Sequence, residues 1–239
     1  METEKRLDGR WALVTGSSRG VGQQVALGLA ERGCQVILHG RSAGHLEETR
    51  ALLAPFGGQI HTAAGDLGTE AGVAAVIEQV QAGPGQVDVL FNNAAIQNAW
   101  QEVWDIPQAE WQRSFQINVF ALVALCNAFA PAMRERGWGR IVNVTSQIKG
   151  VAPLAPYSAS KAAVDKYTRD LAVALRGSGV LINALDPGWL RTDLGGPDAP
   201  GTVESVLPGA LQPVLLPDDG ASGCFFDAQD PESWSGRAW

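Results

Sequence analysis

The chain has 239 residues, of which 46% are hydrophobic and 18% are charged, and this composition excludes an intrinsically disordered protein. Eighteen Lys and Arg stand against 25 Asp and Glu, and the resulting net charge of −7 argues against binding to the phosphates of a nucleic acid. The length fits one large domain or two small ones.

Cysteine usage and the apolar runs indicate a soluble, cytoplasmic protein. Cys34, Cys126 and Cys224 lie far apart and fit neither a disulfide framework nor a metal site, so we expect reduced thiols and no metal. Residues 1–6 lack the apolar stretch of a signal peptide. The longest apolar run, Val119 to Met133, is interrupted by an asparagine and a proline and is too short to span a bilayer. We therefore expect no membrane partner.

Short runs rich in Val, Ile and Leu alternate along the chain with longer Ala-rich stretches at helical spacing. Strands are predicted over Trp11–Thr15, Gln35–His39, Gln59–Ala63, Val87–Asn92, Arg140–Thr145, Val180–Leu185 and Gly223–Phe226. Helices are predicted near Val21–Arg32, Ala43–Pro55, Thr69–Gln81, Gln108–Arg136 and Ala159–Arg176. The linkers are long enough for crossover helices, so the sequence predicts an α/β domain with a parallel seven-stranded sheet and helices on both faces.

A glycine-rich turn follows the first predicted strand at once. Its sequence is Thr15-Gly16-Ser17-Ser18-Arg19-Gly20-Val21-Gly22. Glycine adopts backbone angles that are closed to other residues and lets a pyrophosphate approach the main chain, at the positive end of the helix that follows. A glycine-rich turn without a ligand is the alternative. The position between the first strand and first helix of an α/β chain favours a dinucleotide site.

The end of the second predicted strand indicates which dinucleotide binds. NAD sites usually place Asp or Glu about 20 residues past the glycines, whereas NADP sites place Arg near the 2′-phosphate. Here the strand ends Leu38-His39-Gly40-Arg41-Ser42, without an acid, and Arg19 adds a second cation inside the turn. Two guanidinium groups suit a dianionic phosphate. The sequence therefore predicts NADP(H), unless both arginines are ordinary surface charges.

One of the two tyrosines, Tyr157, lies four residues before one of the few lysines, Lys161. On a helix the two side chains share one face. A phenol with a pKa of about 10 exchanges its proton slowly at neutral pH, and a nearby ammonium favours the phenolate. We therefore expect Lys161 to lower the pKa of Tyr157 towards the working range. A plain i,i+4 contact on a solvated helix is the alternative.

Further motifs, in a fixed order, identify a family. They are Asp66-Leu67 after the third predicted strand, Asn92-Asn93-Ala94-Ala95 after the fourth, Asn118 in the long helix, Ser146 after the fifth, and Pro187-Gly188 followed by Thr192. With the glycine turn and Tyr157-x3-Lys161, they make the chain resemble a short-chain dehydrogenase/reductase of the short form, over nearly its whole length. The resemblance implies a doubly wound Rossmann fold. It also implies one NADP-binding domain over residues 1–239, with a segment of about 187–215 that covers the substrate.

The resemblance implies four catalytic residues. Tyr157 is expected to protonate the alkoxide formed in ketone reduction, or to act as the base in the reverse direction. Lys161 is expected to hydrogen-bond the nicotinamide ribose and to lower the pKa of Tyr157. Ser146 would hold the substrate carbonyl beside the phenol, and Asn118 would anchor a water-linked proton path behind Lys161.

The resemblance also implies a set of cofactor contacts. Asp66 is expected at the adenine, Thr192 at the nicotinamide carboxamide, and Asn92 behind the strand ends. The full expected set is Gly16, Ser18, Arg19, Gly20, Val21, Gly22, Arg41, Ser42, Asp66, Leu67, Asn93, Ala94, Tyr157, Lys161, Pro187, Gly188 and Thr192.

Two positions depart from the family pattern. Ser146 precedes Tyr157 by eleven residues, about two fewer than is usual, so either Thr145 or Ser146 could supply the hydroxyl. We expect Ser146, because it follows the fifth strand in the usual register. The fourth-strand motif ends in Ala95, where Gly is usual.

Tryptophans follow two of the predicted strand ends. Trp100 and Trp104 follow the fourth strand and Trp189 follows Pro187-Gly188, where α/β sheets bind ligands. We expect an apolar, aromatic substrate pocket, with simple packing of the indoles as the alternative. The expected lining residues are Ile96, Trp100, Gln147 and Trp189.

The expected function is NADPH-dependent reduction of a small ketone or aldehyde to the alcohol. Oxidation of a secondary alcohol of the polyol or steroid type is the alternative among enzymes, and a non-catalytic NADP-binding sensor or scaffold is the alternative outside them. The family implies a homodimer or homotetramer. His39, His45 and His61 match no motif and are expected to be surface or strand-end residues without a catalytic or metal role.

Overall fold

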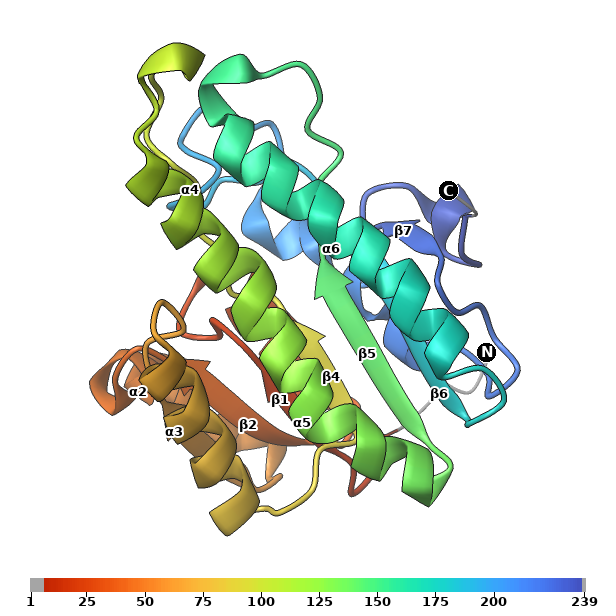
Figure 1. The fold of residues 1–239 in the computed structure, drawn as a ribbon. Helices are drawn as coiled ribbons and strands as arrows, with labels where there is room; N and C mark the ends of the chain where they lie inside the picture. Colours follow the sequence, from red (N-terminus) through yellow and green to blue (C-terminus); the bar gives the residue numbers. More distant parts are fainter. Residues whose placement is uncertain (1–6, 238–239) are drawn as a thin grey trace.

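Seven parallel strands form one sheet in the computed structural model, which describes residues 7–237 (Figure 1). The strands are β1 (Trp11–Val14), β2 (Gln35–Gly40), β3 (Ile60–Ala64), β4 (Val89–Asn92), β5 (Gly139–Val144), β6 (Val180–Asp186) and β7 (Phe225–Asp227). Their order is β3-β2-β1-β4-β5-β6-β7. The order reverses between β1 and β4, and in such sheets ligands bind at the carboxyl ends of the strands beside that switch point. Residues 1–6, which argued against a signal peptide, lie outside the described residues.

Helices cover both faces of this sheet (Figure 1). They are α1 (Gly20–Glu31), α2 (Glu47–Leu53), α3 (Glu70–Ala82), α4 (Gln108–Phe115), α5 (Ala121–Arg136), α6 (Ala155–Ala174) and α7 (Gln212–Leu215). One core cluster joins Val25 of α1 and Val214 of α7 to the sheet, and a second joins Val76 of α3, Leu125 of α5 and Val164 of α6 to its other face. The predicted doubly wound fold is confirmed.

The central strands are buried along their whole length. Every residue of β4, β5 and β6 is buried, which follows from their continuous apolar stretches and from cover on both faces. The register places Val14 of β1 opposite Phe91 of β4, and Phe91 opposite Val142 of β5. The loops that leave β1, β4 and β5 therefore meet at one edge of the sheet.

The segment Gln108–Arg136 is long and apolar enough, by length and composition alone, to cross a membrane. In the fold it consists of α4, a π-helical turn at Gln116–Phe120, and α5. Leu125 and Met133 of α5 are fully buried in the core cluster beneath it. This packing identifies the segment as a core helix of the domain.

Helix α6 begins at Ala155, four residues before its predicted start. Pro156 stands in its first turn, where a missing N–H costs no helical hydrogen bond. As a result Tyr157 and Lys161 both lie within the helix, one turn apart.

The Pro- and Gly-rich stretch after β6 has two parts. Residues 203–215 form short helical turns, and Val206, Leu211 and Val214 are buried in the core beside α1. Residues 187–202 form an isolated bridge between Leu190 and Gly201, and within this part Leu190 belongs to the same core cluster. The expected substrate-covering segment of about 187–215 therefore has residues in the core along both parts, and its role stays a prediction.

Candidate active site

The turn between β1 and α1 has the shape that its glycines predict. Gly16 and Gly20 have φ angles of +65° and +61°, in the left-handed region that favours glycine. A Cβ at Gly22 would overlap the carbonyl oxygen of Gly16 and lie 2.6 Å from Nδ2 of Asn93. The first turn of α1 also leaves N–H groups without partners inside the helix, as every helix start does. The turn is therefore a concave surface that fits the pyrophosphate of a dinucleotide.

Asn93 holds this turn from behind. Its Nδ2 donates to the carbonyl oxygens of Thr15 at 2.9 Å and Gly16 at 3.2 Å. Its backbone N–H donates to Oγ1 of Thr15 at 2.9 Å, and the N–H of Ala94 donates to the same oxygen at 3.0 Å. The structure thus places Asn93 and Ala94, two predicted cofactor residues, against the glycine turn.

His39 braces the same turn from β2, which sequence reasoning missed. Its Nδ1 accepts the N–H of Gly16 at 3.0 Å, so the other ring nitrogen carries the proton and donates to the carbonyl of Gly65 at 3.1 Å. Ser17 donates its N–H to the carbonyl of His39 at 3.0 Å. Burial lowers the pKa of His39 and keeps the ring neutral. The prediction of a strand-end residue is right, but His39 is not a surface residue, because it is only 3% exposed.

The predicted phosphate-binding cations lie at the edge of the turn. Arg19 forms an ion pair of 2.9 Å with Asp193, and both side chains are exposed. Thr192 is next to the turn as well, because a Cβ at Gly20 would lie 3.6 Å from its Cγ2. Arg41 is exposed just past the end of β2. The structure thus brings the segment of Thr192 and Asp193 to the glycine turn that contains Arg19.

The predicted adenine residue, Asp66, lies two residues past the end of β3. Asp66 is exposed, and its Oδ1 accepts the N–H of Gly68 at 2.9 Å. Leu67 is buried beneath it and accepts a hydrogen bond from Gln116 at 3.4 Å. Ser42, beyond β2, is exposed and pairs with His45 at 3.1 Å.

Tyr157, Lys161 and Ser146 meet at the carboxyl end of β5. The Ser146 side chain hydrogen-bonds the phenol of Tyr157. Nζ of Lys161 donates to the carbonyl oxygen of Val144 at 2.8 Å and lies 5.7 Å from the centre of the Tyr157 ring. Tyr157 and Lys161 are both buried.

The acid–base properties of this pair differ from the sequence-based expectation. Burial raises the pKa of Tyr157 to about 12, while its hydrogen bond with Ser146 opposes the rise. Burial also lowers the pKa of Lys161 to about 8. The expectation that the ammonium brings the phenol towards neutral pH is therefore wrong for the protein alone, because the loss of water around Tyr157 is the largest influence on its pKa.

The structure distinguishes the two candidate hydroxyls after β5. The hydroxyl of Thr145 donates to the carboxylate of Asp165 on α6 and is buried. Ser146 instead hydrogen-bonds Tyr157. Burial raises the pKa of Asp165 to about 6, and the hydrogen bond from Thr145 limits that rise. Ser146 is thus the hydroxyl beside the phenol.

Asn118 lies in the π-helical turn between α4 and α5. Its side chain accepts the N–H of Ile96 and donates to the carbonyl of Ile96, both at 2.9 Å. It also donates to Oγ of Ser160 at 2.9 Å, and Ser160 donates to the carbonyl of Tyr157 at 2.7 Å. A π-turn inserts an extra residue that re-aims a side chain, and such turns are frequent at functional sites. Asn118 thereby fixes the loop after β4 to the helix that carries Tyr157.

A buried amide chain lies behind these groups. Asn92 donates to Oδ1 of Asn143 at 2.9 Å, and Asn143 donates to Oγ1 of Thr168 at 2.9 Å. Strands β4 and β5 are thus tied to each other and to α6, in agreement with the supporting role expected of Asn92.

A comparison with known protein families identifies the family to which the chain belongs. The family described as short chain dehydrogenase matches residues 10–201. This chain belongs to the short-chain dehydrogenase family. The enzyme is therefore an oxidoreductase that acts on CH–OH groups.

Relatives of this short-chain dehydrogenase act on sugar acids. Gluconate 5-dehydrogenase of Gluconobacter oxydans is 35% identical over 190 residues, which are 79% of this chain and 74% of the relative. The 2-dehydro-3-deoxy-L-rhamnonate dehydrogenase (NAD(+)) of a Sphingomonas strain is 38% identical over 191 residues, 79% of this chain and 75% of the relative. The crystal structure of a gluconate 5-dehydrogenase from Burkholderia cenocepacia, in complex with NADP and tartrate, has a TM-score of 0.82 and 29% identity. It covers 93% of this chain and 94% of that one.

The predicted substrate-pocket residues of the dehydrogenase differ in their exposure and in their hydrogen-bond partners. The indoles of Trp100 and Trp189 are 67% and 61% exposed, so neither is packed in the core. The Trp189 Nε1 donates to the carbonyl of Gly195 at 2.7 Å, which holds its ring in place. Gln147 donates its side chain to Asp227 at 2.8 Å, and Asn118 binds both backbone groups of Ile96. Trp100 and Trp189 therefore lie at the surface, and the substrate pocket expected around them stays a prediction.

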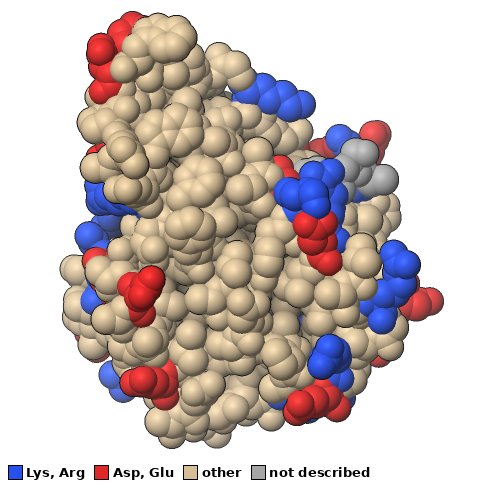
Figure 2. All heavy atoms as spheres, viewed as in Figure 1, with Lys and Arg blue, Asp and Glu red and all other residues tan. Residues whose placement is uncertain are grey.

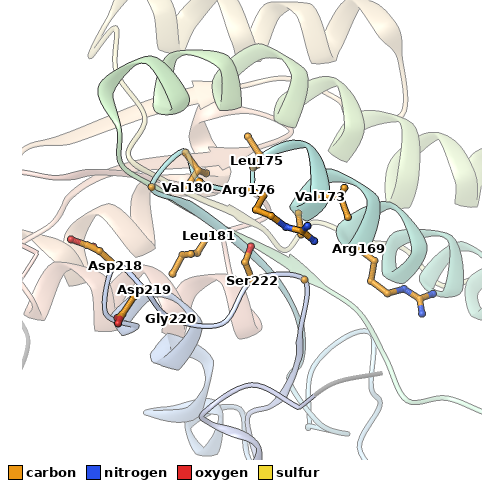
Figure 3. A pocket seen from close by; sticks show the side chains of 14 residues that line it. Arg169, Val173, Leu175, Arg176, Val180, Leu181, Asp218, Asp219, Gly220 and Ser222 are labelled. Atoms are coloured by element: carbon orange, nitrogen blue, oxygen red, sulfur yellow. The ribbon is translucent and has the colours of Figure 1, made fainter.

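A groove of about 480 Å³ lies at the other end of β6, away from the Tyr157 site (Figure 3). Arg169 of α6 and Arg176, just past the end of that helix, stand on one side of it, and Asp218 and Asp219 of the loop before β7 on the other. Its lining includes none of the predicted site residues. Within residues 7–237, no three His, Cys, Asp or Glu side chains gather in a way that could hold a metal ion.

Proposed function

We propose that this dehydrogenase reduces a small ketone or aldehyde to the alcohol with NADPH. The observation that carries the proposal is the hydrogen bond between Ser146 and the buried Tyr157, one helical turn from the buried Lys161. A bound nicotinamide cofactor supplies the hydride for this reaction. The residues that would hold it are those of the glycine turn, Asn93, Arg41 and Thr192.

The side chains around Tyr157 supply orientation and a proton. The hydroxyls of Ser146 and Tyr157 can both donate to one substrate oxygen, which fixes the carbonyl in place. With a pKa of about 12, Tyr157 is protonated at neutral pH, which is the form that a general acid needs in the reducing direction. Lys161, with a pKa of about 8, remains largely an ammonium at neutral pH and stabilises the phenolate that proton transfer leaves.

Tyr157→Phe tests this function directly. The variant should bind NADPH like the wild type but lose more than about 100-fold in kcat on a panel of ketones. Tyr167→Phe is the matched control, because Tyr167 lies on the same helix but contacts Cys126 instead. Equal turnover of Tyr157→Phe and Tyr167→Phe would overturn the proposal.

The preference for NADP over NAD is the second part of the proposal. Arg41 and Arg19 support it, while the relatives are divided: one is an NAD(+) enzyme and another was crystallised with NADP. Arg41→Asp should shift the ratio of kcat/KM for the two cofactors at least tenfold towards NAD. Arg50→Asp, an exposed arginine on α2, is the control. An unchanged ratio in Arg41→Asp would refute this assignment.

Oxidation of a secondary alcohol is the alternative direction, and the relatives named as dehydrogenases of sugar acids favour it. Assays with NADP and a polyol, steroid and gluconate panel compare it with ketone reduction. A higher kcat/KM for an alcohol would replace the proposed direction. Tight cofactor binding without turnover on either panel would instead favour the sensor or scaffold.

We also propose that the enzyme is a cytoplasmic homodimer or homotetramer. The face formed by α4, α5 and α6 shows few charged side chains (Figure 2). Phe120, before α5, is 56% exposed, and Val173, at the end of α6, is 62% exposed. Light scattering should give a mass of two or four chains, and Val173→Asp or Phe120→Asp should reduce it. A wild-type mass of one chain would refute the assembly.

A further inference from the structure

Asp186 ends β6 next to the Tyr157 site and is 6% exposed. Its Oδ2 accepts the N–H of Gln147 at 2.6 Å, and its Oδ1 accepts the N–H of Gly188 at 2.8 Å. Gln147 follows Ser146, and Gly188 belongs to the turn expected at the nicotinamide. Burial raises the pKa of Asp186, while the hydrogen bonds from Gly188 and Gln147 lower it and favour the ionised carboxylate.

We propose that Asp186 is a positioning residue for the proposed carbonyl reduction, on which this inference rests. Its carboxylate joins the Ser146 loop to the Pro187-Gly188 turn and places a negative charge beside the phenol of Tyr157. Two parts of the site that are about 40 residues apart in sequence thus share one buried anchor.

The surroundings of Asp186 hold the carboxylate in this place. Gln147 donates its backbone N–H to Asp186 and its side-chain Nε2 to Asp227 of β7 at 2.8 Å. Asp227 accepts the N–H of Gln229 at 2.9 Å, and Gln229 donates to the carbonyl of Pro187 at 3.0 Å. These hydrogen bonds form a closed ring that connects Asp186, Gln147, Asp227 and Gln229 around the Pro187-Gly188 turn.

The charge of Asp186 acts on the pKa values of the titratable groups that face it. Tyr157, Lys161 and Asp165 face it from α6, and Asp227 faces it from β7. The negative charge of Asp186 raises the pKa of Tyr157 and also raises the pKa of Lys161, against the lowering caused by burial. Both effects keep protons on the pair, which suits an enzyme that donates a proton to its product.

Neutral substitutions at Asp186 separate charge from structure. In Asp186→Asn the phenol loses a neighbouring negative charge, so the pKa of Tyr157 should fall. Asp186→Ser should give the same fall with a smaller side chain, which provides a second variant if Asn perturbs folding. Asp227→Asn is the matched control, since it removes a carboxylate from the same ring of contacts but not from beside Tyr157.

The measurement is the carbon-13 shift of the tyrosine ring carbon Cζ as a function of pH. The chain has only two tyrosines, and Tyr167→Phe assigns their signals. This readout needs neither cofactor nor turnover, so it is independent of the Tyr157→Phe test of the proposed function. In the assay, kcat should fall at least tenfold in both Asp186 variants with a smaller change in KM, and the basic limb of the pH profile for reduction should move to lower pH.

Two results would overturn the inference. One is a Tyr157 titration that does not move in Asp186→Asn and Asp186→Ser, or that moves equally in Asp227→Asn. The other is wild-type kcat in both Asp186 variants, which would show that the anchor does not position the site.

Discussion

Gly22→Ala tests whether the glycine turn is shaped by close packing of backbone on backbone. Gly22 is buried in the first turn of α1. A Cβ there would overlap the carbonyl oxygen of Gly16 and lie 2.6 Å from Nδ2 of Asn93. A backbone oxygen cannot rotate away as a flexible side chain can, so the turn itself must open.

The expected loss of stability follows from opposing terms. Alanine is favoured over glycine inside a helix by about 1 kcal/mol. Overpacking costs about 1–3 kcal/mol, and the two hydrogen bonds from Asn93 to the turn are each worth about 1 kcal/mol. The net effect is a loss of about 2–4 kcal/mol, which lowers Tm by about 4–16 °C in a chain of this size. Since the displaced turn is the expected pyrophosphate site, NADPH affinity should fall at least tenfold.

Urea unfolding and a fluorescence titration with NADPH measure both effects. Gly44→Ala is the control, because a Cβ at Gly44 has no heavy atom within 4 Å. If Gly22→Ala unfolds and binds NADPH like Gly44→Ala, the argument from backbone contact is refuted.

Three further predictions test the scaffold, the turn and the pocket. Asp88 is fully buried and accepts the N–H of Trp11 at 3.0 Å. Asp88→Ala should therefore lower the free energy of unfolding, measured in urea, by about 3 kcal/mol. The control Asp170→Ala, on the surface, should lower it by less than about 1 kcal/mol. An equal cost would refute this difference. Because burial lowers the pKa of His39, the unfolded chain binds a proton that the folded chain does not, and the wild type should lose stability as the pH falls below about 6.5. His39→Asn should flatten that slope, and an unchanged slope would contradict it. Trp189→Ala should raise KM for apolar ketones several-fold, and an unchanged KM would exclude its ring from the pocket.

The amino-acid sequence by itself determined the architecture and the order of the site. Alternation of apolar runs with Ala-rich helical stretches is a local property, and it predicted all seven strands to within a few residues. The glycine turn was predictable for the same reason, because Gly16 and Gly20 are needed for their own backbone angles. The spacing of Tyr157 and Lys161 was sufficient to place them one helical turn apart.

Only the tertiary structure decided the hydrogen-bond partners and the pKa values of the site residues. His39 and Asp186 belong to no motif, and their importance comes from contacts with Gly16, Gly65 and Gln147, which lie 23 to 39 residues away. The raised pKa of Tyr157 depends on burial, which no spacing along the chain expresses. Residue type and local spacing fix backbone shape, whereas proton affinity depends on which distant groups exclude water from a side chain.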